Sequence, residues 1–342
     1  MKTITMIILA TLLVTGAMAE SGSVDNLAWE LNESGVLRIT GTGAIPDYFS
    51  TEELPPWFAS GRQIKQLEIA NGVTSIGSSA FAMCKELVAV SLPPSIVHIG
   101  DFAFSFCNSL PDITLPESLE SIGHSAFLAC RNLESVDIPI SVKEIGFSAF
   151  SACNSLTNVT IPSSVTTVKR NVFRDCTSLV NVRIPSTVTN IGVYAFANCV
   201  RLKDIVIPKS VKSIGDLAFS DCISLTDILI PDSVMTWNSV FTNCSGLTTI
   251  TIPKTVTNIG SQTFSGCKGL VSINIPSSVL NIGELAFDDC SSLKEIRVNW
   301  AIPPVIPDDA FRNIDRKNCK LIVPSGAETV YKNTEGWKKF II

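Results

Sequence analysis

One interval recurs along this chain and limits its fold more than any other feature. Ten cysteines lie at positions 84, 107, 130, 153, 176, 199, 222, 244, 267 and 290, so eight of the nine spacings are 23 residues and one is 22. Leucine stands three residues after every one of them, from Leu87 to Leu293. A period of about 20–50 residues kept over such a length is typical of a solenoid, in which each repeat forms one coil.

Each coil is expected to contain one short strand. The residues after each cysteine alternate between apolar and outward positions, as in "LVAVSLPPS" and "LKDIVIPKS", which is typical of a half-buried strand. Proline follows in most coils and ends the strand, because it has no N–H to donate to a continuing ladder. Ser or Thr stands two positions later, where its hydroxyl can bond a nearby backbone group or link neighbouring coils.

The segment before each cysteine is predicted to form a short helix on the outer side of the coil. Stretches such as "SSAFAMC" and "DLAFSDC" place Ala, Phe and Cys inward at near-helical spacing. An Ile–Gly pair precedes most of them, and glycine permits backbone angles that a side chain resists. Lys169 replaces this glycine in the fifth coil, so a positive φ is not an absolute need there. The predicted class is an α/β solenoid of about ten 23-residue coils.

Both ends of such a stack need a lid, because a lone coil cannot offset the entropy of its own ordering. Four of the five tryptophans flank the repeats: Trp29 and Trp57 before them, Trp300 and Trp337 after them. Residues 27–40 are expected to form two strands around an Asn-Glu-Ser-Gly turn, and amphipathic helices are expected after a last strand at 321–323. The predicted division is a signal peptide (1–19), an N-terminal cap (20–60), the repeats (61–298) and a C-terminal cap (299–342).

The first 19 residues are predicted to be a secretory signal peptide. Lys2 precedes an apolar run from Ile4 to Val14 and an Ala-Met-Ala site that ends at Ala19. This arrangement is typical of a signal cleaved after Ala19, and the run is too short for a membrane span. No later stretch approaches about 18 uninterrupted apolar residues. We therefore expect a mature chain that lacks a transmembrane segment and is secreted, periplasmic or displayed at the cell surface.

The charge balance argues against a nucleic acid partner. The chain carries 26 Lys and Arg against 31 Asp and Glu, a net charge of −5 at pH 7, whereas binding to phosphates requires a basic surface. Residues 20–60 hold seven acids against Arg38 alone, and residues 299–342 hold seven bases against five acids. We interpret these ends as solvated cap surfaces; end-to-end association is the alternative.

The repeat resembles a known family. It has the form C-x-x-L-x-x-[IV]-x-[ILV], followed by P-x-[ST] and by G-x-x-[AV]-F-x-x-C. Residues 61–298, with the flanking stretches "GTGAIPDYFS" and "VPSGAETVYKNTEGWKKF", resemble BspA-type leucine-rich repeats of secreted and surface proteins of host-associated bacteria and trichomonads. The resemblance implies a concave parallel β-sheet and adhesion or binding at a host–microbe interface, to matrix proteins for some members. Unlike the general leucine-rich pattern, this chain has Ser or Thr at the asparagine position.

The eleven cysteines are expected to be reduced and buried. Equivalent side chains of stacked coils point the same way at about 4.7–4.9 Å, whereas a disulfide needs converging Cβ atoms about 3.5–4.5 Å apart. A line of cysteines is also not a tetrahedral metal site, and no C-x-x-C occurs. His98 and His124 follow their preceding cysteines by 14 and 17 residues, so they point differently and are interpreted as surface residues.

No residue pattern indicates catalysis. A nucleophilic mechanism needs a Ser or Cys near a base that an acid orients, and nothing in the sequence singles out such a group. "GTG" at 41–43 follows a strand but lacks the rest of a phosphate-binding signature. We therefore predict that the protein is not an enzyme and uses no cofactor and no metal.

The candidate ligand-binding surface is the exposed side of the strands, five and seven residues after each cysteine. Most of these residues are small and polar, but Val206 and Leu229 form an apolar pair on neighbouring strands, with charged residues around it. Such a pair is typical of an anchor for a protein or peptide, with ordinary surface variation as the alternative. The predicted binding residues are Arg183, Asp204, Val206, Asp227, Leu229 and Thr251.

The predicted function is a non-catalytic, secreted or surface-displayed binding or adhesion module for an extracellular protein or glycan, with host matrix proteins among the candidates. A structural, self-associating component of an envelope layer is the alternative, and an enzyme is the third class.

One coil departs from the period. "DSVMTWNSVFTNC", residues 232–244, is one residue short, with Trp237 and Asn238 where an Ile–Gly pair is expected. We interpret Trp237 as filling the place of the isoleucine, and Asn238 as replacing glycine because asparagine tolerates left-handed backbone angles. An exposed contact role for Trp237 is the alternative.

Overall fold

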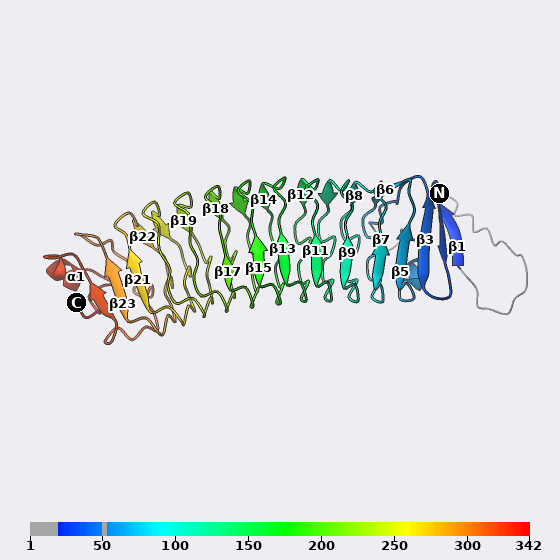
Figure 1. The fold of residues 1–342 in the computed structure, drawn as a ribbon. Coiled ribbons are helices and arrows are strands. Elements are labelled where there is room, and N and C mark those ends of the chain that lie inside the picture. The colour runs from blue at the N-terminus through cyan, green and yellow to red at the C-terminus, as the bar shows by residue number, and fades with distance from the viewer. Residues whose placement is uncertain (1–19, 50–52) are drawn as a thin grey trace, which may run out of the picture. The chain divides into compact units, whose positions relative to one another are not determined.

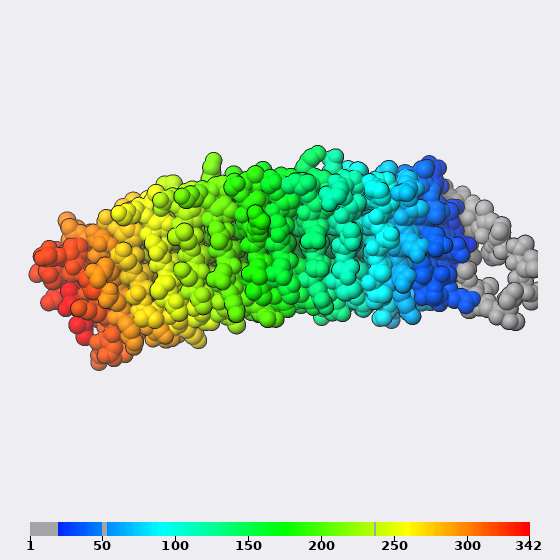
Figure 2. Space-filling view, viewed as in Figure 1, coloured from blue at the N-terminus to red at the C-terminus, as the bar shows by residue number. Residues whose placement is uncertain are grey.

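The computed structural model describes residues 20–49 and 53–342. They form two compact units, one ending at Val165 and the other running from Thr166 to Ile342. Each unit is a parallel β-solenoid, and the chain has about 11 coils. Within each unit the coils follow one another in the order of the sequence, as the colours of Figures 1 and 2 show. The predicted signal peptide lies outside the described residues.

Unit 1 begins with an antiparallel sheet of three strands: β1 (Glu20–Val24), β2 (Leu27–Leu31) and β3 (Val36–Gly41). The predicted Asn-Glu-Ser-Gly turn joins β2 to β3. Asn32 Oδ1 accepts the N–H groups of Ser34 and Val36 at 3.0 Å, and Gly35 has a φ of +85°, an angle that only glycine adopts without strain.

The predicted row of parallel strands continues from β3. In unit 1 it comprises β5 (Gln66–Ile69), β7 (Ala89–Ser91), β9 (Asp112–Thr114), β11 (Ser135–Asp137) and β13 (Asn158–Thr160). β3 pairs with β5, β5 with β7, and β9 with β11. From β7 onward the strands start five residues after a cysteine, and a proline near the end of each keeps it short.

A second row of parallel strands was not predicted. In unit 1 it comprises β4 (Gly43–Ala44), β6 (Val73–Ile76), β8 (His98–Ile99), β10 (Ser121–Ile122) and β12 (Glu144–Ile145), each paired with the next. The last residue of β6, β8, β10 and β12 is the buried isoleucine of the Ile–Gly pair. η1 (Phe58–Ser60) is a single 3-10 turn.

Unit 2 repeats this arrangement. Its first row comprises β15 (Asn181–Arg183), β17 (Asp204–Ile205), β21 (Ser272–Ile275), β23 (Glu295–Val298) and β24 (Lys320–Ile322). Its second row comprises β14 (Thr167–Val168), β16 (Asn190–Ile191), β18 (Ser213–Ile214), β19 (Thr236–Trp237), β20 (Asn258–Ile259) and β22 (Asn281–Ile282).

The segments before the cysteines are turns, so the predicted short helices and the α/β class are not confirmed. Before Cys84, the N–H groups of Ser79, Phe81 and Met83 donate to carbonyls of the next coil at 2.7–2.9 Å, while the N–H groups between them donate three residues back. Ser79 and Met83 have φ values of +57° and +64°. An α-helix needs an unbroken run of local bonds at negative φ. Among the described residues the only α-helix is α1 (Glu328–Asn333).

Aromatic rings form a column through the core of each unit. In unit 1, Trp57 stacks on Phe81, which starts a series of phenylalanines whose centroids are 5.3–5.5 Å apart. In unit 2, the column ends where Phe311 contacts Trp337 and Phe340. Trp57 and Trp337 are buried, each against the ring at one end of a column. Of the expected C-terminal helices only α1 forms.

Side chains also bond one coil to the next. The hydroxyl of Ser95 donates to Val73 O, and that of Ser118 to Ile96 O, both at 2.7 Å. Ser210 does the same in unit 2. The predicted hydroxyl links between coils are thus confirmed at these positions.

At Gly100 and Gly215 the need for glycine comes from space and not from a positive φ, whereas Lys169 occupies the equivalent position of the fifth coil. A Cβ on Gly100 would lie 2.6 Å from Ser78 N and 2.8 Å from Gly77 C, both in the preceding coil. A Cβ on Gly215 in unit 2 would lie equally close to backbone atoms of its preceding coil. Neither glycine has a positive φ. Neighbouring coils therefore approach closely at this corner, and a side chain would separate them.

The short coil has the packing that we predicted for its tryptophan. Trp237 is buried, pairs with Ile259 in the second row, and meets Phe264 edge to face at a centroid distance of 5.9 Å. Its Nε1 atom has no hydrogen-bond partner among the described residues. Asn238 does not adopt the left-handed angles that we expected; the next residue, Ser239, does, with a φ of +54°.

Candidate binding surface

The structure brings the six predicted binding residues together on one exposed face of unit 2. Arg183 ends β15, and β15 pairs with β17 so that Asn181 aligns with Asp204. Isolated bridges then link Val206 to Leu229 and Leu229 to Thr251. All six side chains are exposed: Arg183, Asp204, Val206, Asp227, Leu229 and Thr251. We call this group the strand-face site.

The apolar pair at its centre is unusually open to solvent. Val206 is 78% exposed and Leu229 is 74% exposed. The residues on either side of them along the chain, such as Ile205 and Ile230, point inward and are buried. Alternation along the strand thus fixes the pair outward. Two branched apolar side chains on adjacent strands are close enough to form one contact surface.

Charged side chains border the pair. Arg183 precedes Val206 in the same column of neighbouring strands, and Asp204 and Asp227 stand two residues before Val206 and Leu229. Within residues 20–49 and 53–342, the side chains of these three charged residues make no hydrogen bond or ion pair. They remain able to bond groups of a partner.

The backbone at the apolar pair is less regular than that of the strands around it. β17 has two residues and the next two coils contribute only isolated bridges, whereas β21 and β23 have four residues each. The regular ladder of the first row is therefore interrupted in these coils.

A hollow lies on the strand face of unit 1. Its volume is about 640 Å³, and its polar and acidic lining includes Asp112, Thr114, Glu117, Ser135 and Asp137. The exposed Ile140 stands at its edge. Sequence reasoning did not single out this hollow, because three acids on a solvated sheet give no signal in one sequence.

The described residues contain no group of three or more His, Cys, Asp or Glu side chains placed to hold a metal ion. His98 is exposed and His124 is half-buried. His98 Nδ1 is 2.9 Å from Ser121 Oγ, and the ring of His124 stacks on Phe147 at 4.8 Å.

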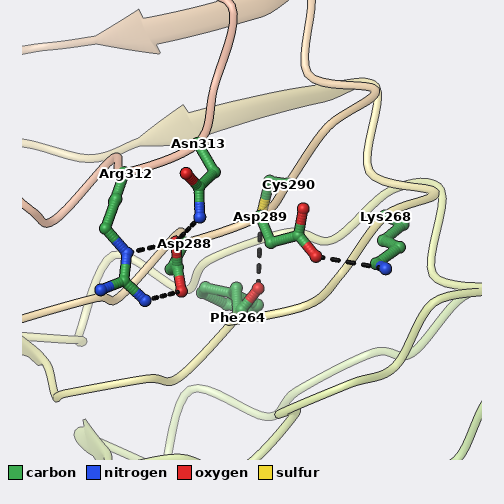
Figure 3. Close-up of polar contacts among 7 residues, drawn as sticks. All are labelled: Phe264, Lys268, Asp288, Asp289, Cys290, Arg312 and Asn313. Atoms are coloured by element: carbon green, nitrogen blue, oxygen red, sulfur yellow. Dashed lines mark hydrogen bonds and ion pairs between the residues drawn. The ribbon is translucent and has the colours of Figure 1, made fainter.

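The thiols are buried and unreactive in character. All eleven cysteines lie within the described residues, and none forms a disulfide. Most Sγ atoms donate to the phenylalanine carbonyl of the preceding coil, as Cys290 does to Phe264 O at 3.2 Å (Figure 3). Burial raises the pKa of the thiols of Cys84, Cys130, Cys222 and Cys267 to about 12. Because the thiolate is the nucleophile, these groups are poorly suited to catalysis at neutral pH.

Near the same cysteine, one buried acid is fully paired. Asp288 accepts hydrogen bonds from Arg312 at 2.7 and 3.0 Å and from Asn313 at 3.0 Å (Figure 3). Asp289, its neighbour, pairs with Lys268 at the surface. The two-pronged bond to Arg312 links the coil of Asp288 to the last turns of unit 2, which is a structural role.

Sequence reasoning looked for partners only on the strands and missed apolar side chains in the turns of unit 1. Phe58, Met83 and Phe106 are exposed there. Phe58 lines two hollows, of about 240 and 220 Å³, and Met83 lines the first of them. A signal was present in the sequence: the residue before the cysteine is Asp, Asn or Gly in the later coils, but Met83 and Phe106 in the first two.

Across residues 20–49 and 53–342, no helix has the length and apolar character needed to cross a bilayer.

Comparisons with known proteins agree with this geometry. A family model described as "BspA type Leucine rich repeat region" matches residues 56–179, 120–240, 168–294 and 236–334. No match was found among curated proteins. A leucine-rich repeat protein from Bacteroides ovatus is 26% identical, with a TM-score of 0.61 over 92% of this chain and 91% of that one.

Two further solved structures are similar. The pneumococcal vaccine antigen PcpA is 21% identical, with a TM-score of 0.59 over 94% of this chain and 98% of that chain; at this identity the likeness concerns the fold alone. A leucine-rich cell surface protein from Faecalibacterium prausnitzii is 25% identical, with a TM-score of 0.45 over the same shares. The family match spans most of the coils described above, and the chain belongs to the BspA-type leucine-rich repeat family.

Proposed function

We propose that this protein is a non-catalytic binding or adhesion module, secreted or held at the cell surface, that recognises an extracellular protein or glycan through the strand-face site. Host matrix proteins are among the candidate partners. Membership of the BspA-type leucine-rich repeat family supports the binding class. The predicted export signal at residues 1–19 supports the location.

The observation that carries the proposal is the exposed pair Val206 and Leu229. Two large apolar side chains that are more than two-thirds exposed contribute little to folding, and surface apolar groups lower the free energy mainly when a partner covers them. Arg183, Asp204 and Asp227 around the pair can steer and orient that partner, because charges at the rim act chiefly on association rate and specificity.

The test changes Val206 and Leu229 together to Ser in the purified protein. Partners are first captured from a matrix or mucosal extract on the unmodified protein and identified. Their affinity for the double variant should fall by about tenfold or more, while the melting temperature should move by no more than about two degrees, because surface changes rarely alter stability by more than ~0.5 kcal/mol.

A matched control changes Met235 and Leu280 together to Ser. Both are exposed apolar side chains of unit 2, but they lie next to the second row of strands. This control should bind as the unmodified protein does. Equal binding by both double variants would remove the strand-face site from the proposal. Salt-sensitive oligomers in light scattering would favour the self-assembling alternative.

A further inference from the structure

The turns of unit 1 carry a cluster of exposed apolar side chains away from the strand-face site. Its members are 39–76% exposed, and we call them the outer-turn patch: Phe49, Leu54, Phe58, Met83, Phe102 and Phe106. Exposed apolar clusters of this kind are uncommon on proteins without partners and mark interaction sites.

Two hollows open within the patch. One has a volume of about 240 Å³ and is bordered by Phe58 and Met83; the other has a volume of about 220 Å³ and is bordered by Phe49, Leu54 and Phe58. Both are lined by Pro55, Phe58 and Ala82, so they share one wall. The pair forms two adjacent sockets, each suited to an apolar side chain.

The backbone under the patch indicates that its side chains are not there for folding. Met83, Phe102 and Phe106 have φ values of +64°, +56° and +61°. This left-handed region disfavours bulky residues and favours Gly, Asn and Asp. At the place of Met83 and Phe106, directly before the cysteine, every coil of unit 2 from Cys176 to Cys290 has Asp, Asn or Gly. Directly before the cysteine, large apolar residues occur only in the first two coils, where they are exposed; at the place of Phe102, unit 2 also has large residues such as Leu217.

The charged side chains that line the sockets are all basic. Arg62 and Lys85 are the only charged residues that line either hollow. Within the described residues their side chains make no ion pair or hydrogen bond. The acidic residues nearby in the sequence, Glu53 and Glu86, line neither hollow. A ligand that fits therefore combines apolar side chains with negative charge.

We propose that the outer-turn patch is a second interaction surface, which binds a segment of a partner protein carrying two apolar side chains next to carboxylates. The two sockets take the apolar side chains, and Arg62 and Lys85 pair with the carboxylates. An anionic membrane fits less well, because its attraction depends on clustered basic residues, and this chain has a net charge of −5.

The test uses the full chain and two synthetic fluorescent peptides. One has the sequence DEFDELFDE; the other, KKFKKLFKK, has the same apolar residues with the charge reversed. We expect the acidic peptide to bind at least about tenfold more tightly than the basic one, a difference of ~1.4 kcal/mol.

Two double variants test whether the acidic peptide binds at the outer-turn patch. Met83→Asn with Phe106→Asn removes two apolar side chains while asparagine suits the left-handed backbone, so the fold should be kept and the melting temperature should not fall. Arg62→Glu with Lys85→Glu reverses the charge. Each double variant should bind the acidic peptide with an affinity lower by about tenfold or more. Lys209→Glu with Lys254→Glu makes the same charge change on exposed lysines of unit 2 and should alter binding less than about twofold.

Three results would overturn the proposal. The first is equal binding of the two peptides. The second is unchanged acidic-peptide affinity in the Met83 and Phe106 double variant, with its fold verified by circular dichroism. The third is a concentration-dependent dimer of the unmodified protein that this variant abolishes, because the patch would then be an interface between copies of the chain. None of these results bears on the strand-face site.

Discussion

Trp237 illustrates at the residue scale how one side chain can compensate for a missing residue. It takes the place of an isoleucine in the second row of strands and fills the core beside Phe241 and Phe264. Its indole nitrogen nevertheless has no hydrogen-bond partner within the part of the chain that the structure describes. Burying an unpaired donor costs about 1–3 kcal/mol, so this tryptophan stabilises through volume alone.

This arrangement predicts how substitutions of Trp237 rank. Trp237→Ala should lower the free energy of unfolding by roughly 3–5 kcal/mol, because it leaves a large cavity. Trp237→Phe removes the unpaired N–H along with part of the ring, and should cost less than half as much. Urea unfolding measures both values.

Trp57→Phe is the matched control. Trp57 and Trp237 are 1% and 2% exposed, but Trp57 Nε1 donates to Ala80 O at 2.8 Å. Its replacement by Phe should therefore cost ~1 kcal/mol more than Trp237→Phe. A smaller loss at Trp57 would contradict our account of the unpaired nitrogen.

At the scale of elements, the sequence predicted the strands of the first row, because alternation and proline act locally. It did not predict the turns before the cysteines. Ala, Phe and Cys have helical spacing there, but the backbone bonds with the next coil at every second residue. The left-handed positions hold residues as different as Ser79, Phe102 and Leu217, so no residue type reveals them.

The second row of strands and part of the binding surface also could not be predicted from the sequence alone. A two-residue strand such as Ser121–Ile122 is too short to show a period, and only its pairing partners define it. The sequence did predict which residues of the strand-face site would share an exposed face, because alternation determines this. It could not reveal the hollows of unit 1, which depend on how the first turns pack against Trp57 and Phe58.

Gly100→Ala tests the close approach of coils. Alanine normally stabilises a position of negative φ by about 0.4–1 kcal/mol over glycine. Here we expect the opposite, a loss of at least ~1–3 kcal/mol, because the new methyl group would press on the backbone at Gly77 and Ser78. Thermal and urea unfolding give the sign, and a stabilised variant would show that the coils can separate without cost.

At the scale of the whole molecule, the thiols couple stability to alkaline pH. Burial holds the pKa of Cys84, Cys130, Cys222 and Cys267 at about 12, against 9.0 for an unperturbed thiol. Between these values the unfolded chain loses protons that the folded chain keeps. Stability from each thiol is therefore complete below pH 9 and is lost as pH rises toward 12.

We expect the free energy of unfolding to fall steeply between pH 9 and 10.5, by up to ~1.4 kcal/mol per pH unit for each such thiol. Urea unfolding at several pH values, with a reductant present, measures the slope. Cys130→Ala removes one of these thiols, so it should make the fall in the free energy of unfolding less steep by up to ~1.4 kcal/mol per pH unit. A stability that stays constant from pH 8 to 10.5 would be incompatible with these buried thiols.

The alternating bonds of the turns have a consequence for how such a chain can evolve. In the turn before its cysteine, each coil within a unit donates N–H groups to carbonyls of the next coil, as Ser79, Phe81 and Met83 do, and offers equivalent carbonyls to the N–H groups of the coil before it. A gene segment that encodes one coil can therefore be duplicated or lost by recombination while every remaining coil keeps complementary neighbours. Selection is then free to adjust the number of coils separately from the residues that each coil displays.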